Sequence, residues 1–274
     1  MKKSAHQENK IALYCLGIFF WYGLEVEKDY GQAYEKFKKS AELGFTKSYL
    51  PLKSLSVRKN DTNQAAIWIL RGYDAGDLDC KVELGYMFLG GLGVEKNEKK
   101  GFEYIEEAYR MGNKRAIGRL GDCYLNGWGT SKDLSKAFAL FKEGAPTSEL
   151  CKLRLGQMYI KGEGTEKDEQ RGLALIKEVA ATGNPSDAKL YLGRIYANGW
   201  GVSVSRKKAP EFFEQAAHEG NVLAMVVLGN AYYEGRYPLS KDIELAKSWL
   251  QKAKDRGNKQ ASELLEKIEA QETN

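Results

Sequence analysis

A short motif that recurs at a near-constant spacing constrains the fold of this chain more than any other feature. Each copy has a Leu-Gly pair, an aromatic residue three positions after the glycine, and a second glycine three positions after the aromatic. The first glycine of each of the six copies stands at Gly17, Gly85, Gly121, Gly156, Gly193 and Gly229. After a gap of 68 residues that follows Gly17, the separations are 35 to 37 residues. A fixed period in this range indicates a repeat array, in which each unit contacts only its neighbours.

Each repeat is predicted to form a pair of antiparallel helices. In the copy that follows Gly76, residues Cys80, Leu84, Gly85 and Phe88 fall on one helical face. Glycines after this face are expected to end the first helix, because glycine adopts the left-handed conformation at low cost. Residues that favour the N-cap of a second helix then recur at Asp29, Asn97, Asp133, Asp168, Ser205 and Asp242.

The second helix is predicted to bury small and large apolar residues and to end at a glycine. The closing glycines are expected to be Gly44, Gly76, Gly112, Gly183, Gly220 and Gly257. No strand pattern occurs between these helices, so the fold class is all-α.

Two repeats depart from the pattern. Between Gly44 and Gly76, Leu52-Lys53 replaces Leu-Gly, several loop residues are missing, and Pro51 should shorten or kink the first helix. In the fourth repeat, Pro146 is expected to end the second helix early. After the last repeat, Ala261, Leu264, Leu265 and Ile268 predict an amphipathic helix that caps the array.

The full pattern, L-G-x-x-Y-x-x-G-x-G-V…D-x-x-K-A…F-x-x-A-A-x-x-G, resembles the Sel-one-like repeat, a relative of the tetratricopeptide repeat. The resemblance extends from Ala12 to Asn258. It implies a right-handed α-solenoid of about seven helix-turn-helix repeats, the second of them degenerate, plus a C-terminal capping helix. We expect one domain over residues 1–274, with repeats at about 11–44, 45–76, 77–112, 113–148, 149–183, 184–220 and 221–257, and a cap at 259–271.

Charge and cysteine content favour an ordinary cytoplasmic protein. Lys and Arg total 42 against 37 Asp and Glu, and these charges are spread along the chain. The four cysteines show no metal-ligand spacing, and Cys80 and Cys151 occupy positions where other repeats have alanine, so we expect buried, reduced thiols. The apolar stretch of residues 11–24 also fits the repeat pattern; if it acted as a leader instead, the protein would be periplasmic or secreted. No stretch reaches the length of a membrane span.

The residues give no support for catalysis or for a cofactor. The GxG turns follow helices and do not match a dinucleotide-binding loop, which follows a strand. The only histidines, His6 and His218, stand at no spacing that suggests a catalytic or metal site. We therefore predict no enzyme activity, no metal and no cofactor.

One cation recurs at the same position of successive repeats, at Lys100, Lys136, Arg171 and Lys208. This basic ladder has two interpretations. The side chains can pack over a neighbouring helix, or they can form a surface for polyanions such as nucleic acid, which would bind with steep salt dependence.

The resemblance implies that the first helices line a concave groove that binds a protein or peptide. Residues two, five and six places after the repeat leucine would then contact the partner, and Trp128 and Trp200, in the GxG turns, are either partner anchors or local lids. The predicted partner-binding residues are Trp21, Tyr22, Tyr86, Leu89, Asp122, Asn126, Trp128, Gln157, Lys161, Arg194, Asn198, Trp200, Asn230, Tyr233 and Glu234. The expected function is a non-enzymatic interaction scaffold. The alternative is an immunity protein that neutralises a cognate bacterial toxin, a role known in this family.

Overall fold

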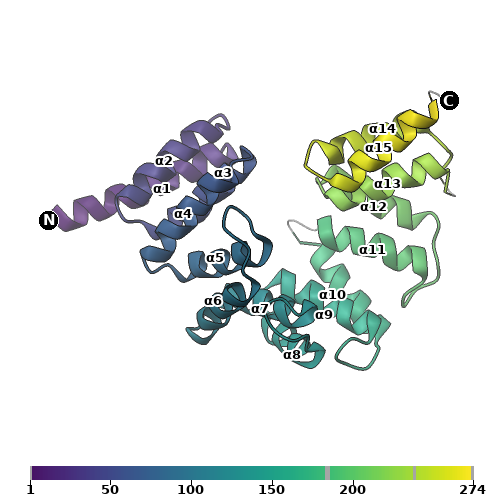
Figure 1. The fold of residues 1–274 in the computed structure, drawn as a ribbon, viewed down its shortest axis with the longest axis horizontal. Helices are drawn as coiled ribbons and strands as arrows, with labels where there is room; N and C mark the ends of the chain where they lie inside the picture. The colour runs from purple at the N-terminus through teal and green to yellow at the C-terminus, as the bar shows by residue number, and fades with distance from the viewer. Residues whose placement is uncertain (1, 183–185, 237–238, 273–274) are drawn as a thin grey trace. The chain divides into compact units, whose positions relative to one another are not determined.

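A computed structural model describes residues 2–182, 186–236 and 239–272, with side chains described from residue 9 to residue 271 outside the same gaps. Over these residues the structure is entirely helical, with fifteen α-helices, one 3-10 turn and no strand (Figure 1). The helices of the first four repeats are α1 Lys2–Tyr22, α2 Tyr30–Glu42, α3 Tyr49–Arg58, α4 Thr62–Asp74, α5 Leu78–Gly90, α6 Glu98–Arg110, α7 Lys114–Asn126 and α8 Leu134–Gly144. The remaining helices are α9 Glu149–Lys161, α10 Glu169–Ala180, α11 Ser186–Asn198, α12 Lys208–His218, α13 Val222–Glu234, α14 Ile243–Lys254 and α15 Lys259–Glu272. The predicted all-α fold of seven helix pairs and a cap is confirmed.

The chain divides into two compact units, and each is described by itself. Unit 1 spans Met1–Leu140 and unit 2 spans Phe141–Asn274, so the boundary lies within α8. In each unit the odd-numbered helix is the first helix of its repeat, and the even-numbered helix packs against it as the second. A single continuous domain over residues 1–274 stays a prediction.

Five of the six predicted N-caps of the second helices are confirmed. At each of them a side-chain oxygen accepts a hydrogen bond from a backbone N–H two or three residues further along, for example at 2.8 Å for Asp29. These bonds satisfy donors that a helix leaves unpaired at its start. The five are Asp29, Asn97, Asp133, Asp168 and Asp242. The prediction of Ser205 was wrong: its hydroxyl accepts from the Lys208 N–H at 3.2 Å, but α12 begins only at Lys208 and Lys207 is its N-cap.

Glycines end the helices as predicted. The first helices α5, α7, α9 and α13 end at C-cap glycines with positive φ, for example +66° at Gly91. The second helices are followed by glycines with positive φ at Gly44, Gly76, Gly112, Gly220 and Gly257. The predicted closing residue Gly183 lies outside the described residues.

The second glycine of the GxG turn has a role that the sequence did not reveal. A Cβ built on Gly201 would lie 2.9 Å from the carbonyl oxygen of Glu169, at the start of the preceding repeat's second helix. The Gly201 N–H also donates to Glu169 Oε2 at 2.7 Å, and Gln170 Nε2 donates to the Gly201 oxygen at 2.7 Å. Gly129 meets Glu98 in the same way. The turn therefore docks each repeat onto the one before it, and only glycine leaves room for the contact.

The degenerate second repeat also forms a helix pair, but its first helix, its turn and its contact with the first repeat differ from those of the other repeats. Its first helix, α3, has 10 residues, whereas the first helices α5, α7, α9, α11 and α13 have 13 each, which confirms the shortening expected from Pro51. The short turn after α3 uses Asn60 in the left-handed conformation, with φ +58°. At the interface with α2, buried Ser48 donates a hydrogen bond of 2.9 Å to Ser40, where other repeats have small apolar residues.

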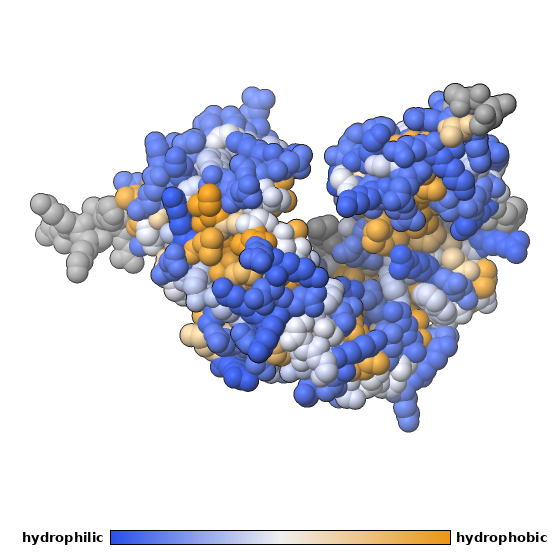
Figure 2. Space-filling model, viewed as in Figure 1, coloured by the Kyte–Doolittle hydropathy of each residue, from blue (hydrophilic) through white to orange (hydrophobic). Residues whose placement is uncertain are grey.

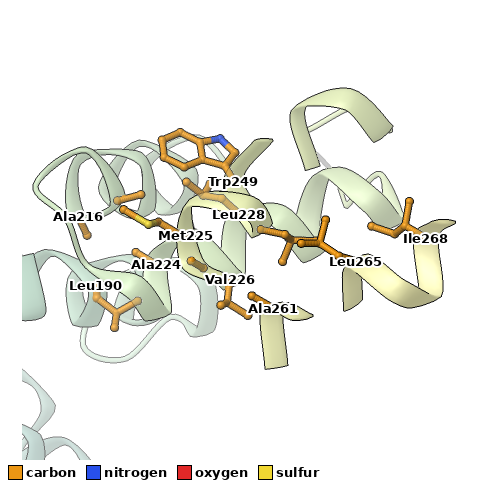
Figure 3. Close-up of a cluster of buried hydrophobic side chains, with 13 residues drawn as sticks. Leu190, Ala216, Ala224, Met225, Val226, Leu228, Trp249, Ala261, Leu265 and Ile268 are labelled. Atoms are coloured by element: carbon orange, nitrogen blue, oxygen red, sulfur yellow. The ribbon is translucent and has the colours of Figure 1, made fainter. Parts of the chain in front are cut away.

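The predicted cap is also confirmed. Ala261, Leu265 and Ile268 of α15 are buried, and Figure 3 shows them in one cluster with Leu228 and Trp249. None of the four cysteines forms a disulfide, and Cys80, Cys123 and Cys151 have no exposed surface, as expected of small packing residues.

Candidate functional site

A hollow of about 300 Å³ lies on the first-helix face of unit 1. Its wall is aromatic and apolar on the side of α1 and α3, and charged on the side of α5 and α7. The lining residues are Tyr14, Ile18, Trp21, Tyr22, Leu50, Pro51, Lys53, Ser54, Glu83 and Arg115. We call it the unit 1 hollow.

A buried carboxylate organises the charged side of the unit 1 hollow. Glu83 is only 5% exposed, and its two oxygens contact Lys53 Nζ at 3.0 Å and the Arg115 guanidinium at 3.5 Å. These three residues come from α3, α5 and α7, so the network ties successive repeats together. The Arg115 guanidinium also lies 3.9 Å from Asp79 of α5, so the network contains two cations and two carboxylates and offers a partner both kinds of charge.

A second hollow, of about 310 Å³, lies on the first-helix face of unit 2. Its floor is apolar and includes Leu223, which is 51% exposed. The lining residues are Arg194, Leu223, Val226, Val227, Asn230, Arg236, Gln260 and Leu264. Arg236 contacts Glu234, whereas the Arg194 guanidinium makes no ion pair with any described residue. We call this the unit 2 hollow.

Four of the predicted partner-binding residues line these hollows. Trp21 and Tyr22 belong to the unit 1 hollow, and Tyr22 is 62% exposed. Arg194 and Asn230 belong to the unit 2 hollow. Whether any of them binds a partner stays a prediction.

Two predicted residues are buried and present no surface to a partner. Leu89 packs in the cluster of Val82 and Ile105, and Asp122 is 4% exposed. Leu89 lies at the C-terminal end of α5, where its side chain turns into the core. Asp122 stands two places after its repeat leucine, as Arg194 and Asn230 do, but α7 buries it.

Several other predicted residues have partners within their own repeat or the next. Asn126 and Asn198 each donate to a backbone oxygen one turn earlier in the same helix, at 2.8 Å. Gln157 accepts a hydrogen bond from Arg154 at 3.2 Å. The Arg119 guanidinium lies over the Tyr86 ring, 4.0 Å from its centroid.

The last predicted residues near the helix ends are similarly engaged. Tyr233 donates from its hydroxyl to Gln271 of the cap at 2.6 Å. Glu234 pairs with Arg236, and that hydrogen bond holds the pKa of the Glu234 carboxyl below its usual value. Lys161 is exposed and lies 3.6 Å from Glu163.

The two turn tryptophans pack against the apolar clusters of their own repeats, and whether they also contact a partner stays a prediction. Both are half-buried: Trp128 packs against the cluster that contains Leu120, and Trp200 against the cluster that contains Leu192. The Trp200 and Tyr191 ring centroids are 5.9 Å apart, and burial raises the pKa of Tyr191 to about 12, so this phenol stays neutral. Each tryptophan packs where the turn docks onto the preceding repeat.

The hollows include residues that the sequence analysis missed. Leu50, Glu83 and Arg115 in unit 1, and Leu223 and Val226 in unit 2, lie on the N-terminal half of their helices. Helical periodicity could have identified them. The helical face that contains the residue two places after the repeat leucine also contains the residues one, two and five places before that leucine.

The basic ladder packs on aromatic rings. Lys136 Nζ lies 5.0 Å from the Tyr124 ring centroid, and the Arg171 guanidinium lies 4.6 Å from that of Tyr159. Lys100 covers Phe88 and Lys208 covers Tyr196 in the same way. The cation recurs with the motif aromatic because the two form a cation–π contact within each repeat.

The described residues form a further hollow, of about 360 Å³, which lies among α11, α12 and α13 and is lined mainly by apolar side chains and by Arg206 and Arg236. They contain no cluster of three His, Cys, Asp or Glu side chains able to hold a metal ion. No helix among them is long and apolar enough to cross a bilayer. The His218 ring packs edge-on against Trp249 at 5.2 Å, while the side chain of His6 lies outside the described residues. Figure 2 shows hydrophilic residues over most of the visible face, with apolar ones gathered over α4, where Ile67 and Leu70 are exposed.

Comparison with solved structures places the fold among bacterial repeat proteins. A protective antigen of uropathogenic Escherichia coli with an SLR fold is 27% identical, with a TM-score of 0.52, and the match covers 97% of this chain and 58% of the antigen. A Sel1 repeat protein from Oxalobacter formigenes is 23% identical, with a TM-score of 0.59, over 90% of this chain and 86% of that protein.

Curated relatives match only in part. An uncharacterised protein of Neisseria meningitidis serogroup B is 26% identical over 149 residues, which are 54% of this chain and 32% of that protein. The chitin synthase regulator SKT5 of Saccharomyces cerevisiae is 34% identical over 91 residues, 33% of this chain and 13% of the regulator. The chain thus spans about a third or less of the length of these relatives.

The Sel1 repeat family matches seven segments, which together cover most of the chain and follow the predicted repeats closely. The segments are residues 10–45, 48–77, 79–113, 115–145, 150–181, 186–221 and 222–258. Proteins built of this repeat generally act as scaffolds for protein–protein interaction. With its motif spacing, helix pairs and glycine turns all accounted for, the chain belongs to the Sel1 repeat family.

Proposed function

We propose that this chain is a non-enzymatic scaffold that binds a protein or peptide partner through the first-helix faces of its two units. The general role of Sel1 repeat proteins supports a binding function. The two hollows support the choice of surface, because both lie on first helices and both combine an apolar floor with a charged rim.

The observation that carries the proposal is the composition of the unit 1 hollow. Exposed Tyr22, half-buried Trp21 and the Arg115 side chain line one depression. Trp, Tyr and Arg are the residues that most often dominate binding energy at protein interfaces. A depression of this size accepts one large side chain of a partner, with the Lys53–Glu83–Arg115 network orienting polar groups around it.

The unit 2 hollow suits a related ligand. Half-exposed Leu223 and buried Val226 offer an apolar floor, and the guanidinium of Arg194 stands at the rim without an ion pair among the described residues. A suitable peptide carries an apolar side chain next to a carboxylate. The apolar side chain would be buried in the hollow, and the carboxylate would form an ion pair with Arg194. A cognate toxin is one protein that could present such a segment.

The test lets the protein select its own ligands. A displayed random-peptide library is panned on the full chain, and hydrogen exchange is measured on complexes with the enriched peptides. The proposal predicts peptides with an apolar residue beside Asp or Glu, and protection of the lining segments at residues 14–22, 50–54 or 223–230. Enrichment of peptides that protect only second helices, such as α4 with its exposed Ile67 and Leu70, would contradict it.

A further inference from the structure

The first helix of the array exposes positions that every later repeat buries. In the repeats of α3, α5, α7, α9, α11 and α13, the repeat leucine and the small residue four places before it are at most 5% exposed. These residues are Ser48 and Leu52, Cys80 and Leu84, Ala116 and Leu120, Cys151 and Leu155, Ala188 and Leu192, and Ala224 and Leu228. The equivalents in α1 are Ala12, which is exposed, and Leu16, which is 45% exposed.

The same difference holds one turn further along α1. Phe19 is 36% exposed, whereas its equivalents Leu55, Met87, Cys123, Met158 and Ile195 are at most 3% exposed; in the last repeat the equivalent Ala231 is half-buried. Ile11 and Cys15 flank these positions and are exposed too. We call the residues Ile11, Ala12, Cys15, Leu16 and Phe19 the α1 face; residues 11–22 include no charged side chain.

In later repeats, the second helix of the preceding repeat covers this face. Ile105 and Ala108 of α6 pack in one cluster with Ala116 and Leu120 of α7. In unit 2, the second helix α10 contributes Ile176 and Val179 to the cluster of α11. The covering helix therefore presents a large aliphatic residue and, three places later, a small or β-branched one.

The opposite side of α1 packs against α2, the second helix of the same repeat. Gly17 packs against Phe37 of α2, where an added Cβ would lie 2.6 Å from the ring. Among the described residues, no helix packs on the α1 face as α6 packs on α7. An uncharged apolar stripe of this kind is typical of a surface that binds another element.

We propose that the α1 face binds an amphipathic α-helix of a partner protein, one that carries a large aliphatic residue followed three places later by Ala, Gly or Val. The register of the repeats supports this occupant, because the interfaces of α6 with α7 and of α10 with α11 are built from the same positions. A second copy of the chain is a poorer fit. Its last second helix, α14, already has Leu250 and Ala253 buried under Ala261 and Leu265 of the cap.

Cys15 provides a reporter within the proposed site. It is exposed in the α1 face, while the other three cysteines are fully buried, so a thiol reagent should modify Cys15 first. The probe is a synthetic peptide of residues 97–112, which contains α6 with Ile105 and Ala108. With the full chain and peptide at ~10 times its dissociation constant, Cys15 alkylation should slow about tenfold, because the rate follows the uncovered fraction.

Two variants of the protein and one variant of the peptide distinguish specific binding at the α1 face from non-specific hydrophobic binding. Leu16→Glu should abolish the protection, whereas Val57→Glu, at another exposed apolar residue of unit 1, should keep it; circular dichroism checks that both fold. The peptide with Ile105→Asn should not protect. The proposal is overturned if the native peptide gives no protection up to about 1 mM. It is also overturned if sedimentation shows that a second copy already covers Cys15.

Discussion

Gly85 of α5 and Gly101 of α6 pack against each other's backbone. A Cβ built on Gly85 would lie 2.7 Å from the Gly101 carbonyl oxygen, and one built on Gly101 would lie 2.6 Å from the Gly85 oxygen. The same reciprocal contact joins Gly156 and Gly172 in unit 2. In the first repeat, which lacks the second glycine, Gly17 meets the ring of Phe37 instead, and in the last repeat Gly229 meets the side chain of Leu250. The motif glycine therefore sets how closely the two helices of a repeat approach.

Replacing Gly85 by alanine should destabilise the protein. The added methyl group has backbone atoms in its way, and such overpacking costs about 1–3 kcal/mol. The better helix propensity of alanine offsets up to about 1 kcal/mol of this. Gly31→Ala is the matched control, since Gly31 is an exposed helical glycine near only its own cap. Urea unfolding should show a lower midpoint for Gly85→Ala alone; equal midpoints would refute the close-approach argument.

Asn221 should act both as a helix cap and as a link between repeats. Its Oδ1 accepts from the Ala224 N–H at 3.0 Å, and its Nδ2 donates to Asp187 of the preceding first helix at 2.7 Å. Asn113 and Asp79 form the same link in unit 1. We expect Asn221→Ala to cost about 1–2 kcal/mol in urea unfolding. Asn221→Ser, which keeps the cap and loses the link, should fall between wild type and the alanine variant.

A thiol titration should find one reactive cysteine in the folded protein. Cys15 is exposed, whereas burial raises the pKa of Cys123 to about 12 and also raises that of Cys80, so neither forms a thiolate near neutral pH. Ellman's reagent should give one fast thiol in native buffer and all four after unfolding without reductant. Fewer than four in the unfolded protein would reveal a disulfide and contradict the free cysteines.

Acid should weaken the helix caps in a defined direction. The backbone N–H of Lys136 holds the pKa of Asp133 below its ordinary value of 3.8, and that of Gln32 does the same for Asp29. The pKa of each carboxyl is therefore lower in the folded protein than in the unfolded chain. The charged caps contribute fully to the free energy of unfolding at a pH above the pKa of the unfolded chain, and this contribution is lost as the pH falls through the pKa of the folded protein.

The double variant Asp29→Asn, Asp133→Asn isolates this effect, since asparagine caps equally well and does not titrate. Its melting temperature should fall less than that of the wild type between about pH 6 and about pH 2.5. Parallel decreases in the two proteins would show that these caps do not contribute to the pH dependence.

Local chemistry made much of the fold predictable. The N-cap at Asp29, the closing glycine at Gly112 and the shortening at Pro51 all follow from the preferences of single residues, and the structure confirms each. The docking of Gly201 onto Glu169 could not be predicted in this way, because it joins residues in different repeats.

The candidate site was predicted less well for a physical reason. The sequence marked Arg194 and Asn230, two places after the repeat leucine, and both line the unit 2 hollow. Trp21 and Tyr22, at the C-terminal end of α1, line the unit 1 hollow, whereas Leu89 turns into the core and Trp200 packs against the cluster that contains Leu192. Periodicity identifies a helical face, but the depth of the depression along that face depends on side chains from three neighbouring repeats.

The affinity of a selected ligand for two matched variants tests the proposed binding role most directly. Tyr22→Ala with Arg194→Ala changes one exposed residue in each hollow, and calorimetry should show the dissociation constant rising at least about tenfold, or about 1.4 kcal/mol. The control combines Lys99→Ala, Lys142→Ala and Lys177→Ala, all exposed on second helices, and should leave the affinity unchanged. Loss of binding in the lysine variant with full binding in the hollow variant would show that the partner sits on the second helices and that the proposed surfaces are wrong.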